Sequence, residues 1–272
     1  MNLFVLQVIV SFIVGGFLIG LITLIAERVS LKYRGIVLTI PTTLAVSLFF
    51  IGLTKSPMDV SQAVVTATAG LLISFYIFVL VFAFFSQKRN FILGAILSFV
   101  IWGFCTFLIL TFTPSTFLQA LIIGIPFFVV CYFLIRKLPQ ETEITPVDFN
   151  IKHILLRSFL AGSVIATTVI LAKLFGNAWG GIFANFPASN STALFIYYFA
   201  HGKKVIPSIC KSFFFPGAIG LILYGFTAGV VFPLYGIWWG TLISYFVVGI
   251  FLFLWVQFSK ILNKNKIIAE LD

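Results

Sequence analysis

The chain has 272 residues, of which 61% are apolar and only 9% are charged. A soluble globular domain carries roughly 25% charged residues, so the composition excludes such a domain and predicts a membrane protein. The net charge of +10 is confined to short breaks between apolar runs. The positive charge therefore indicates which loops face the cytoplasm, and no nucleic-acid partner is expected.

In chain order, nine apolar runs come close to the roughly 20 residues that a helix needs to cross a bilayer. Backbone groups find no water in the hydrocarbon core, and the runs lack the alternation of a transmembrane barrel, so we expect helices. The first run is too long for a signal peptide and is interpreted as a retained helix. The candidate spans are 3–26, 35–53, 61–85, 91–112, 115–135, 154–175, 179–200, 207–231 and 235–258.

The placement of basic residues predicts the orientation of these spans. With the N-terminus outside, only Lys55 and Lys173 of the 17 basic residues fall on the outer side. Lysine and arginine accumulate in cytoplasmic loops, so the pattern predicts an outer N-terminus and a cytoplasmic C-terminus. His153 and His201 then fall in cytoplasmic segments and are expected to be solvated. The predicted location is the cytoplasmic (inner) membrane of a prokaryote, with the lipid bilayer as the main partner.

The two halves of the chain resemble each other when Pro41 is aligned with Pro187, which sets an offset of 146 residues. Self-similarity at a fixed offset indicates an internal repeat. Each unit has four helices, and one further helix crosses the membrane between them, so the second unit should be inverted relative to the first. The matched positions are Gly16 and Gly162, Gly35 and Gly181, Gly94 and Gly240, Gly103 and Gly249, and Ser98 and Ser244.

We therefore predict an all-α polytopic membrane protein with about nine transmembrane helices in a 4+1+4 arrangement of inverted repeats. The five-plus-five arrangement of drug/metabolite exporters is the competing architecture, and it fits the offset less well. The predicted divisions are 1–112 for the first repeat, 113–153 for the connecting helix and a polar cytoplasmic linker, 154–260 for the second repeat, and 261–272 for a cytoplasmic tail.

The stretch AKLFGNAWGGIFANFPASNSTALFIYY, residues 172–198, resembles the core of the GlpM-type small inner-membrane proteins. The matching residues are Ala172, Lys173, Gly181, Phe186 and Pro187. The resemblance extends through residue 258. In the first half, the corresponding positions hold Ala26, Gly35 and Pro41, but Glu27 stands where the pattern has lysine.

The resemblance implies four-helix units of dual topology, in which one short chain inserts in both orientations. This chain resembles a fused counterpart of such an opposed pair. The resemblance implies no particular substrate or mechanism.

Polar residues surround both prolines, and each proline is expected roughly 10 Å inside its helix, at 1.5 Å per residue. A proline frees a backbone carbonyl that must find a partner within the membrane. Paired proline-interrupted spans in inverted halves point to a solute site. The alternative is that these polar groups only hold helices together. The candidate substrate-path residues are Thr39, Pro41, Thr42, Thr43, Asn185, Pro187, Ser189, Asn190, Ser191 and Thr192.

Spacing and charge add two further expectations about this region. The i, i+4, i+7 spacing of Asn185, Ser189 and Thr192 predicts one helical face. Glu27 and Lys173 occupy equivalent repeat positions and are the intramembrane charged candidates, since ionisable residues in spans are often functional. The alternative is that both lie at the membrane interface, where a lysine reaches water without a partner.

Sequence patterns of enzymes are absent from the chain. There is no serine–histidine–aspartate set, no HExxH motif and no phosphate-binding glycine loop, so we expect neither catalysis nor a cofactor. The scattered Cys105, Cys131 and Cys210 predict neither disulfides nor a metal site.

The leading functional hypothesis is a transporter or permease that moves a small solute or ion through a site between the two repeats. An ion or small-solute channel is the first alternative, and a non-transporting scaffold or lipid-handling protein is the second. The sequence leaves the solute, the coupling ion and a homo-oligomeric state open.

Overall fold

The computed structural model of the protein describes residues 3–28, 39–88, 91–140 and 150–269, with no side chain described for 26–28, 88, 189 and 259–269. Every regular element in these residues is helical, which confirms the all-α prediction for them. The α-helices are α1 (Leu3–Arg28), α3 (Thr42–Thr54), α4 (Pro57–Gly70), α5 (Tyr76–Lys88), α6 (Phe91–Thr111), α7 (Phe117–Arg136), α8 (Ile151–Phe175), α9 (Asn177–Phe183), α10 (Ala188–His201) and α11 (Ile206–Ala269). A π-helical segment, η1 (Leu71–Phe75), joins α4 to α5, and a 3-10 segment, η2 (Lys203–Val205), precedes α11.

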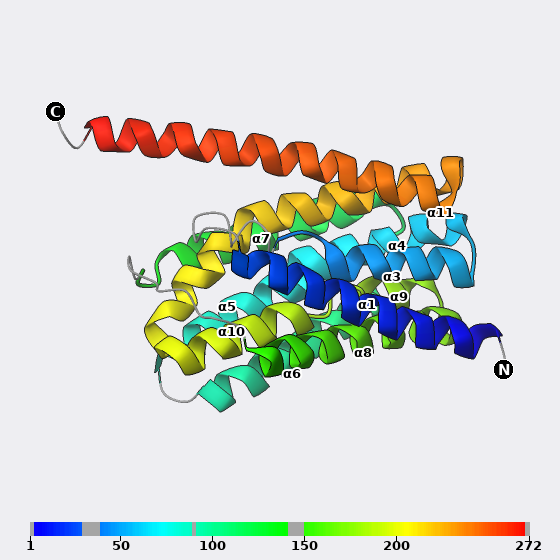
Figure 1. Ribbon diagram of the computed structural model, residues 1–272, viewed down its shortest axis with the longest axis horizontal. Coiled ribbons are helices and arrows are strands. Elements are labelled where there is room, and N and C mark those ends of the chain that lie inside the picture. The colour runs from blue at the N-terminus through cyan, green and yellow to red at the C-terminus, as the bar shows by residue number, and fades with distance from the viewer. Residues whose placement is uncertain (1–2, 29–38, 89–90, 141–149, 270–272) are drawn as a thin grey trace.

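The helices lie side by side, roughly along the long axis of the molecule (Figure 1). α4, η1 and α5 follow one another without interruption. α11 breaks at Gly236, whose φ of 76° is a conformation that glycine adopts without steric cost. The chain reverses direction there (Figure 1), so α11 consists of two antiparallel helices that correspond to the predicted spans 207–231 and 235–258.

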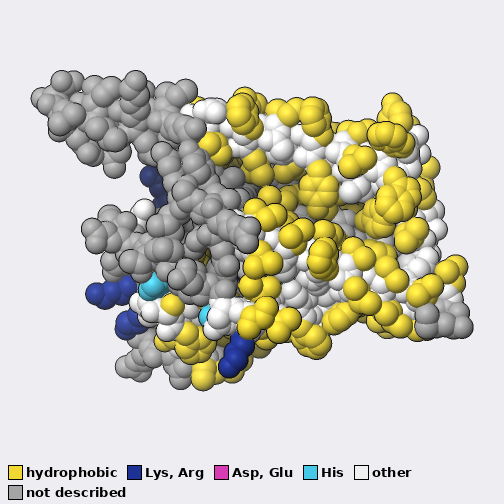
Figure 2. All heavy atoms as spheres, in the orientation of Figure 1, with side chains coloured by type: hydrophobic (Ala, Val, Ile, Leu, Met, Phe, Trp, Pro, Cys, Tyr) yellow, Lys and Arg dark blue, Asp and Glu magenta, His cyan; other side chains and the backbone are white. Residues whose placement is uncertain are grey.

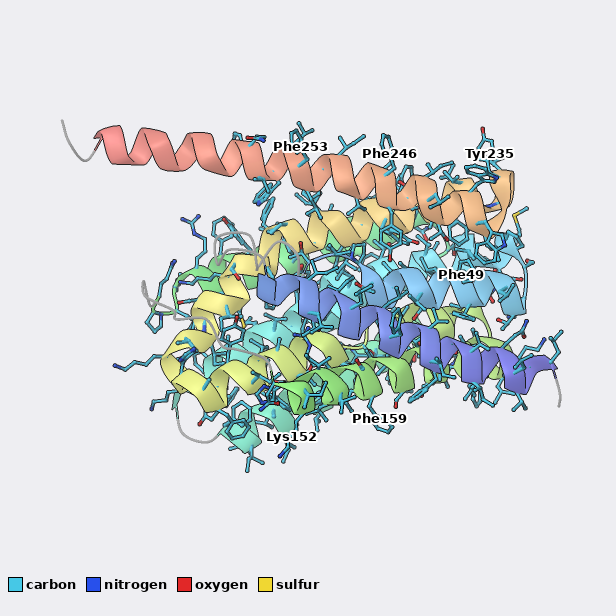
Figure 3. The ribbon with its side chains drawn as sticks, in the orientation of Figure 1. Phe49, Lys152, Phe159, Tyr235, Phe246 and Phe253 are labelled. Atoms are coloured by element: carbon cyan, nitrogen blue, oxygen red, sulfur yellow. The ribbon has the colours of Figure 1, made fainter. Side chains whose placement is uncertain are left out.

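The described helices include six segments that are long and apolar enough to cross a membrane. Their outer surface is covered with large apolar side chains, and Phe159, Phe246 and Phe253 point away from the bundle with exposed fractions of 60%, 70% and 63% (Figure 3). Apolar surface on this scale marks contact with lipid or another protein. The six segments are Leu3–Ile25, Pro57–Gln87, Phe91–Thr111, Phe117–Arg136, Ile151–Phe175 and Lys203–Phe258.

Lysine, arginine and histidine side chains gather at one end of the face shown in Figure 2, whereas the rest of that face is mainly apolar. We call this the basic end. Lys152 at the start of α8 is exposed there (Figure 3). Arg136, at the end of α7, is also exposed. The N-terminus of α1 lies at the opposite end of the molecule (Figure 1), which we call the outer end.

α1 and α8 form a close antiparallel pair, and two glycines make the close approach possible. A Cβ atom on Gly16 would lie 2.8 Å from the Ser158 carbonyl oxygen, and one on Gly162 would lie 2.6 Å from the Phe12 carbonyl oxygen. The two contacts exchange under the 146-residue offset, since Phe12 corresponds to Ser158 and Gly16 to Gly162. Reciprocal contacts of this kind are the mark of a two-fold relation.

A second matched feature lies in α6 and in the second helix of α11. The Ser98 hydroxyl donates to the Gly94 carbonyl at 2.6 Å, and the Ser244 hydroxyl donates to the Gly240 carbonyl at 2.8 Å. Both serines are completely buried. These residues also correspond under the 146-residue offset, so the same local arrangement occurs once in each half.

Candidate solute site at two proline breaks

Pro41 and Pro187 occupy the same kind of backbone break. Pro41 directly precedes α3 and Pro187 directly precedes α10, with φ angles of −75° and −76° and ψ angles of 56° and 36°. The N–H groups of Ala45 and Ser191, each four residues further on, donate to the two proline carbonyls at 2.9 and 2.8 Å. The breaks are therefore alike in conformation and in hydrogen bonding.

Each proline starts a helix, and this corrects the expectation that the prolines lie inside their helices. Proline lacks an N–H and disfavours helical geometry in the residue before it, so a preceding helix tends to stop there. α9 ends at Phe183, so the predicted span 179–200 is two short helices separated by residues 184–187. For the predicted span 35–53, residues 35–38 lie outside the described residues, and the described helix starts only at Thr42.

The first turns of α3 and α10 differ from those of helices that start at the ends of the bundle. Ser56, Thr116 and Asn150 cap α4, α7 and α8 by accepting a backbone N–H with their side chains. Neither Pro41 nor Pro187 makes such a bond. The first N–H of each of these helices is bonded to a backbone carbonyl instead, that of Thr42 to Ile40 and that of Ala188 to Phe186.

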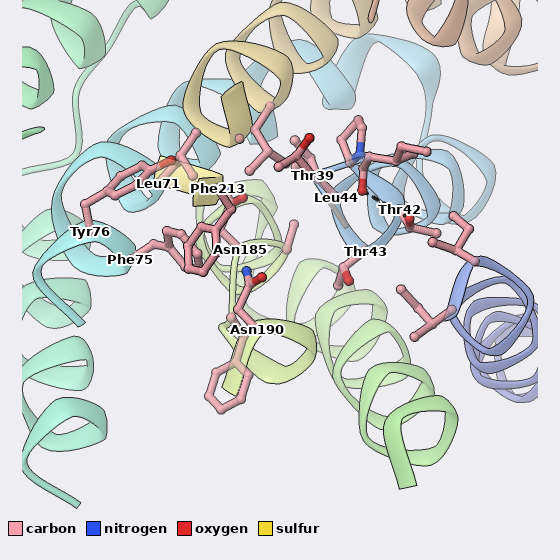
Figure 4. A pocket seen from close by; sticks show the side chains of 18 of the residues that line it. Thr39, Thr42, Thr43, Leu44, Leu71, Phe75, Tyr76, Asn185, Asn190 and Phe213 are labelled. Carbon is pink, nitrogen blue, oxygen red and sulfur yellow. Dashed lines mark hydrogen bonds between the residues drawn. The ribbon is translucent and has the colours of Figure 1, made fainter. Parts of the chain in front are cut away.

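A cavity of about 80 Å³ lies between the two breaks, near the middle of the bundle (Figure 4). At 1.5 Å per residue, Thr42 lies about 18 Å from the far end of α3. Parts of α1, α8, η1, α5 and α11 complete the walls of the cavity. Six of the predicted substrate-path residues line it and are thereby brought together: Thr39, Pro41, Thr42, Thr43, Asn185 and Asn190.

The polar side chains of the cavity come from both breaks. Thr43 and Asn190 lie on different sides of the space and point into it (Figure 4). Asn185 is buried, and its amide nitrogen donates to the Ala67 carbonyl of α4 at 2.7 Å. The Thr42 hydroxyl donates to the Ile40 carbonyl at 3.2 Å. The lining therefore offers hydroxyl and amide groups in an otherwise apolar interior.

Arg157 is a charged residue of the cavity that the sequence interpretation missed. That interpretation assigned Arg157 to a cytoplasmic segment, because it lies only three residues into the predicted span 154–175. The structure starts α8 at Ile151, so Arg157 lies about 9 Å along the helix, with 4% of its surface exposed. Its spacing of four and eight residues from the fully buried Ala161 and Ile165 is the signal that places it on the inner face.

The π-helical segment η1 and Tyr76 also form part of the lining. Leu71, Phe75 and Tyr76 face the cavity, and the Tyr76 hydroxyl donates to the Phe214 carbonyl of α11 at 2.7 Å. π-helical turns within α-helices occur frequently at functional sites. The local sequence LLISF is indistinguishable from ordinary apolar helix, so no pattern could have predicted this feature.

Other predicted residues lie elsewhere in the structure. Ser191 and Thr192 line a separate groove between α8 and α10 and donate to the carbonyls of Pro187 and Ala188. Asn185 precedes α10, so the prediction that Asn185, Ser189 and Thr192 share one helical face is wrong. The side chain of Ser189 lies outside the described residues.

The two charged candidates lie near the ends of two different helices. Lys173 is exposed near the end of α8, a position that suits a lysine at the membrane interface. Glu27 falls in the last turn of α1, and its side chain lies outside the described residues.

A second cavity, of about 650 Å³, opens near the outer end between α4, α7, α9 and α11. Polar side chains form part of its lining, among them Gln62, Ser115 and Asn177. The Asn177 amide accepts from the Lys55 ammonium at 2.7 Å and donates to the Asp59 carboxylate at 2.5 Å. This outer cavity therefore carries an ordered polar network at its edge.

The described residues offer polar groups to a ligand but contain no cluster that could bind a metal. No group of three or more His, Cys, Asp or Glu side chains in this part of the chain could hold a metal ion. Cys105, Cys131 and Cys210 are buried free thiols. The cavity between the breaks is thus suited to binding through hydrogen bonds and the Arg157 charge.

The helices, their apolar surface and the buried polar cavity place this chain in the class of multi-pass helical membrane proteins. Residues 8–115 match a family described as "Protein of unknown function (DUF3147)", a segment that runs from α1 to the loop after α6. Neither a curated protein nor a solved structure matches the chain.

Proposed function

We propose that the protein is a transporter or permease of a small solute in the cytoplasmic membrane of a prokaryote. Its substrate site is the cavity between the two proline breaks, at the interface of two inverted four-helix repeats. The observation that carries the proposal is the convergence of residues 39–44 and 184–190, which are distant in sequence, on one cavity in the middle of the bundle. Paired broken helices of this kind surround the substrate in many transporters.

The repeat is supported by features that recur at an offset of 146 residues. Besides the glycine contacts and serine hydrogen bonds described above, the Thr42 N–H donates to the Ile40 carbonyl at 2.7 Å, and the Ala188 N–H donates to the Phe186 carbonyl at 2.8 Å. Hydrogen bonds at matched positions are more specific than sequence identity in so apolar a chain. The proposed units remain 1–112 and 154–260, with 113–153 between them.

The family match supports the first of these units, because residues 8–115 cover α1 to α6 and stop before α7. The likeness to GlpM-type proteins was carried by residues 172–198 in the second half. The two likenesses fall on different halves, as expected for a duplicated four-helix unit. A fused dual-topology pair, with α7 setting the second unit upside down, accounts for both.

The proposed orientation places the basic end in the cytoplasm and the outer end outside. The exposed Arg136, Lys137 and Lys152 at the basic end are what cytoplasmic loops attract. α1 and α8, which occupy equivalent positions in the two units, run in opposite directions, as an inverted repeat requires.

The contact between α4 and α9, which separates the two cavities, favours a carrier over a channel. α4 and α9 pack tightly there: a Cβ on Gly181 would lie 2.0 Å from the Ala63 carbonyl oxygen, and one on Gly70 would lie 2.7 Å from Ile182. The outer cavity is lined by residues on one side of this contact, such as Thr66, and the central cavity by residues on the other, such as Leu71. Transport then requires α9 to move relative to α4, whereas a channel would need a continuous path.

Flux measurements test the proposal. Purified protein is screened against metabolites by thermal stabilisation, and uptake of the stabilising solute is measured in proteoliposomes. Asn190→Ala and Thr43→Val each remove a polar group that faces the cavity, and each should lower uptake about tenfold. Planar-bilayer recordings separate the classes, since a channel would carry unitary currents and a carrier would not.

Thr167→Val is the matched control. Thr167 is exposed on α8 and donates to the Ser163 carbonyl at 2.8 Å, so the substitution removes a hydroxyl away from the cavity and should leave uptake unchanged. Undiminished uptake in both cavity variants would overturn the proposed site. A fixed, stoichiometric partner in native membranes together with no flux would favour a scaffold.

A further inference from the structure

Two cations lie close together at the basic end, where α7 packs against α11. Arg136 is exposed in the last turn of α7, and Lys211 is half-buried in the second turn of α11. The two side chains are close enough for the guanidinium to act electrostatically on the ammonium. Like charges at this range repel each other, so an anion bound between them would relieve the repulsion.

The described side chains do not balance this pair of charges. The Lys211 ammonium donates to the Leu138 carbonyl at 2.7 Å, which uses one of its N–H groups. The Arg136 guanidinium lies 5.6 Å from the centre of the Tyr132 ring, a contact that uses the face of the group and not the N–H groups at its edge. Among the described side chains, Asp59 is the only carboxylate, and it belongs to the network at the outer cavity.

An aromatic surface lies one helical turn deeper than the two cations. A cation at the C-terminus of a helix is common, so the charges alone would not indicate a ligand. Tyr132 lies four residues before Arg136, and Phe215 lies four residues after Lys211, so each ring shares a helix face with its cation. The separation along each helix is about 6 Å, and the two ring centres are 5.6 Å apart.

The second helix of α11 extends this aromatic surface. Trp255 on that helix stacks on Phe215, with ring centres 5.9 Å apart and planes inclined by 16°. We call Tyr132, Phe215 and Trp255 the aromatic row. Phe215 remains 38% exposed, and Phe133, the neighbour of Tyr132 in α7, is 58% exposed. The row therefore keeps an open apolar face below the cations, as aromatic side chains do at the level of lipid headgroups.

We propose that Arg136 and Lys211 bind the phosphate of an anionic phospholipid, whose acyl chains lie along the aromatic row. Charge complementarity selects this occupant, because an anionic lipid places a phosphate directly above hydrocarbon. A zwitterionic lipid also carries an ammonium group, which two protein cations repel. Basic pockets between transmembrane helices bind anionic headgroups in this way. The inference is independent of the transport proposal, since it concerns the basic end and not the central cavity.

Lipid titrations of the purified protein in a neutral detergent test the inference. Phosphatidylglycerol should raise the melting temperature in proportion to the logarithm of its concentration. Phosphatidylcholine with the same acyl chains should not, and neither should inorganic phosphate at constant ionic strength. Equal stabilisation by phosphatidylcholine would show that acyl chains alone bind, and equal stabilisation by inorganic phosphate would show that the ligand is a free anion. Either result would overturn the inference.

Arg136→Gln and a matched control locate the site. Arg136→Gln should weaken phosphatidylglycerol binding about fivefold and leave the melting temperature without lipid unchanged. Lys152→Gln is the control, because it removes another exposed cation at the basic end (Figure 3) and should leave lipid binding unchanged. An equal loss of affinity in both variants would indicate a diffuse attraction to the basic end and would contradict a defined site.

Lys211→Met separates lipid binding from the stability of the helix end. The variant loses the bond to the Leu138 carbonyl, so its melting temperature without lipid should fall, and its affinity for phosphatidylglycerol should also fall about fivefold. A lower melting temperature with undiminished affinity would show that Lys211 only stabilises the end of α7, which would contradict the inference. Where Lys211→Met does not fold, Arg136→Gln decides the question.

Discussion

The two proline breaks have the same backbone conformation but different polar side chains. Pro41 and Pro187 have nearly the same dihedral angles and carry matched hydrogen bonds. The side chains around them differ: Thr39 in the first half corresponds to Asn185 in the second, and Leu44 corresponds to Asn190. The first break thus supplies hydroxyls to the cavity and the second supplies amides.

The same asymmetry holds for charge. Arg157 corresponds to Ser11 under the 146-residue offset, and the buried Ser11 hydroxyl donates to the Val8 carbonyl of its own helix at 2.8 Å. Among the described lining residues, the cation at the cavity therefore comes from the second half. Two identical chains in opposite orientations would place the same residue on both sides of a two-fold axis. A single chain with two units can instead keep the symmetric scaffold and make its site one-sided.

The largest expected effect tests the symmetric part of this comparison. Gly16→Leu and Gly162→Leu should each lower the free energy of unfolding by about 3 kcal/mol, because each new side chain meets a backbone carbonyl of the facing helix. Unfolding by SDS in mixed micelles measures the loss, which should be similar in the two variants.

Gly103→Leu and Gly249→Leu are the controls, since these residues also correspond in the two halves and a Cβ on either would meet nothing within 4 Å. Both should unfold like the unmodified protein. A loss at only one of Gly16 and Gly162 would contradict the reciprocal packing.

The next effect tests the asymmetry at the breaks. Asn185→Ala should lower the free energy of unfolding by about 1–3 kcal/mol, because the buried Ala67 carbonyl loses its hydrogen bond from the amide. Thr39→Val at the corresponding position keeps its volume and should cost less than Asn185→Ala. Thermal unfolding compares the two, and a larger loss for Thr39→Val would reverse the assignment of the two breaks.

A somewhat smaller effect is expected at Tyr76, which corresponds to Ile222 in the other half. Tyr76→Phe should lower the free energy of unfolding by about 1–2 kcal/mol, because the Phe214 carbonyl loses a donor at 2.7 Å in a fully buried site. Ile222→Val, which removes one methylene, should cost less. An unchanged unfolding midpoint for Tyr76→Phe would show that the bond contributes no net stability.

The smallest effect returns to the symmetric scaffold. Ser98→Ala and Ser244→Ala each remove a hydroxyl bonded to the carbonyl four residues earlier in the same helix. Such local bonds contribute little to helix stability, so both variants should lose less than about 0.5 kcal/mol in the same unfolding assay. A large loss at one serine alone would indicate that the two positions have different surroundings.

The sequence predicted those parts of the fold that depend on apolar length. The runs at 91–112, 115–135 and 154–175 correspond closely to α6, α7 and α8. Matched glycines pointed to a repeat. Where two helices pack closely, the contact leaves no room for a side chain, so only glycine fits at that position. The number of crossings and their orientation stay predictions.

The site was predicted in part, and the misses have physical reasons. Prolines and polar neighbours identified the two breaks, but the break before Pro187 interrupts the helical register, so Asn185 and Thr192 face different spaces. Arg157 was missed because Lys152 and His153, which lie in the first turn of α8, suggested that a polar loop continued as far as residue 153. The π-helical turn η1 arises from packing and leaves no mark on the sequence.

Crosslinking across the central cavity tests the central claim most directly. Thr43→Cys and Asn190→Cys are combined in a chain whose Cys105, Cys131 and Cys210 are replaced by alanine, and membranes are treated with a short bifunctional thiol reagent. The account predicts an efficient intramolecular crosslink between the two breaks and loss of solute uptake. Two cysteines that fail to crosslink, and that react instead with a lipid-phase maleimide, would contradict it.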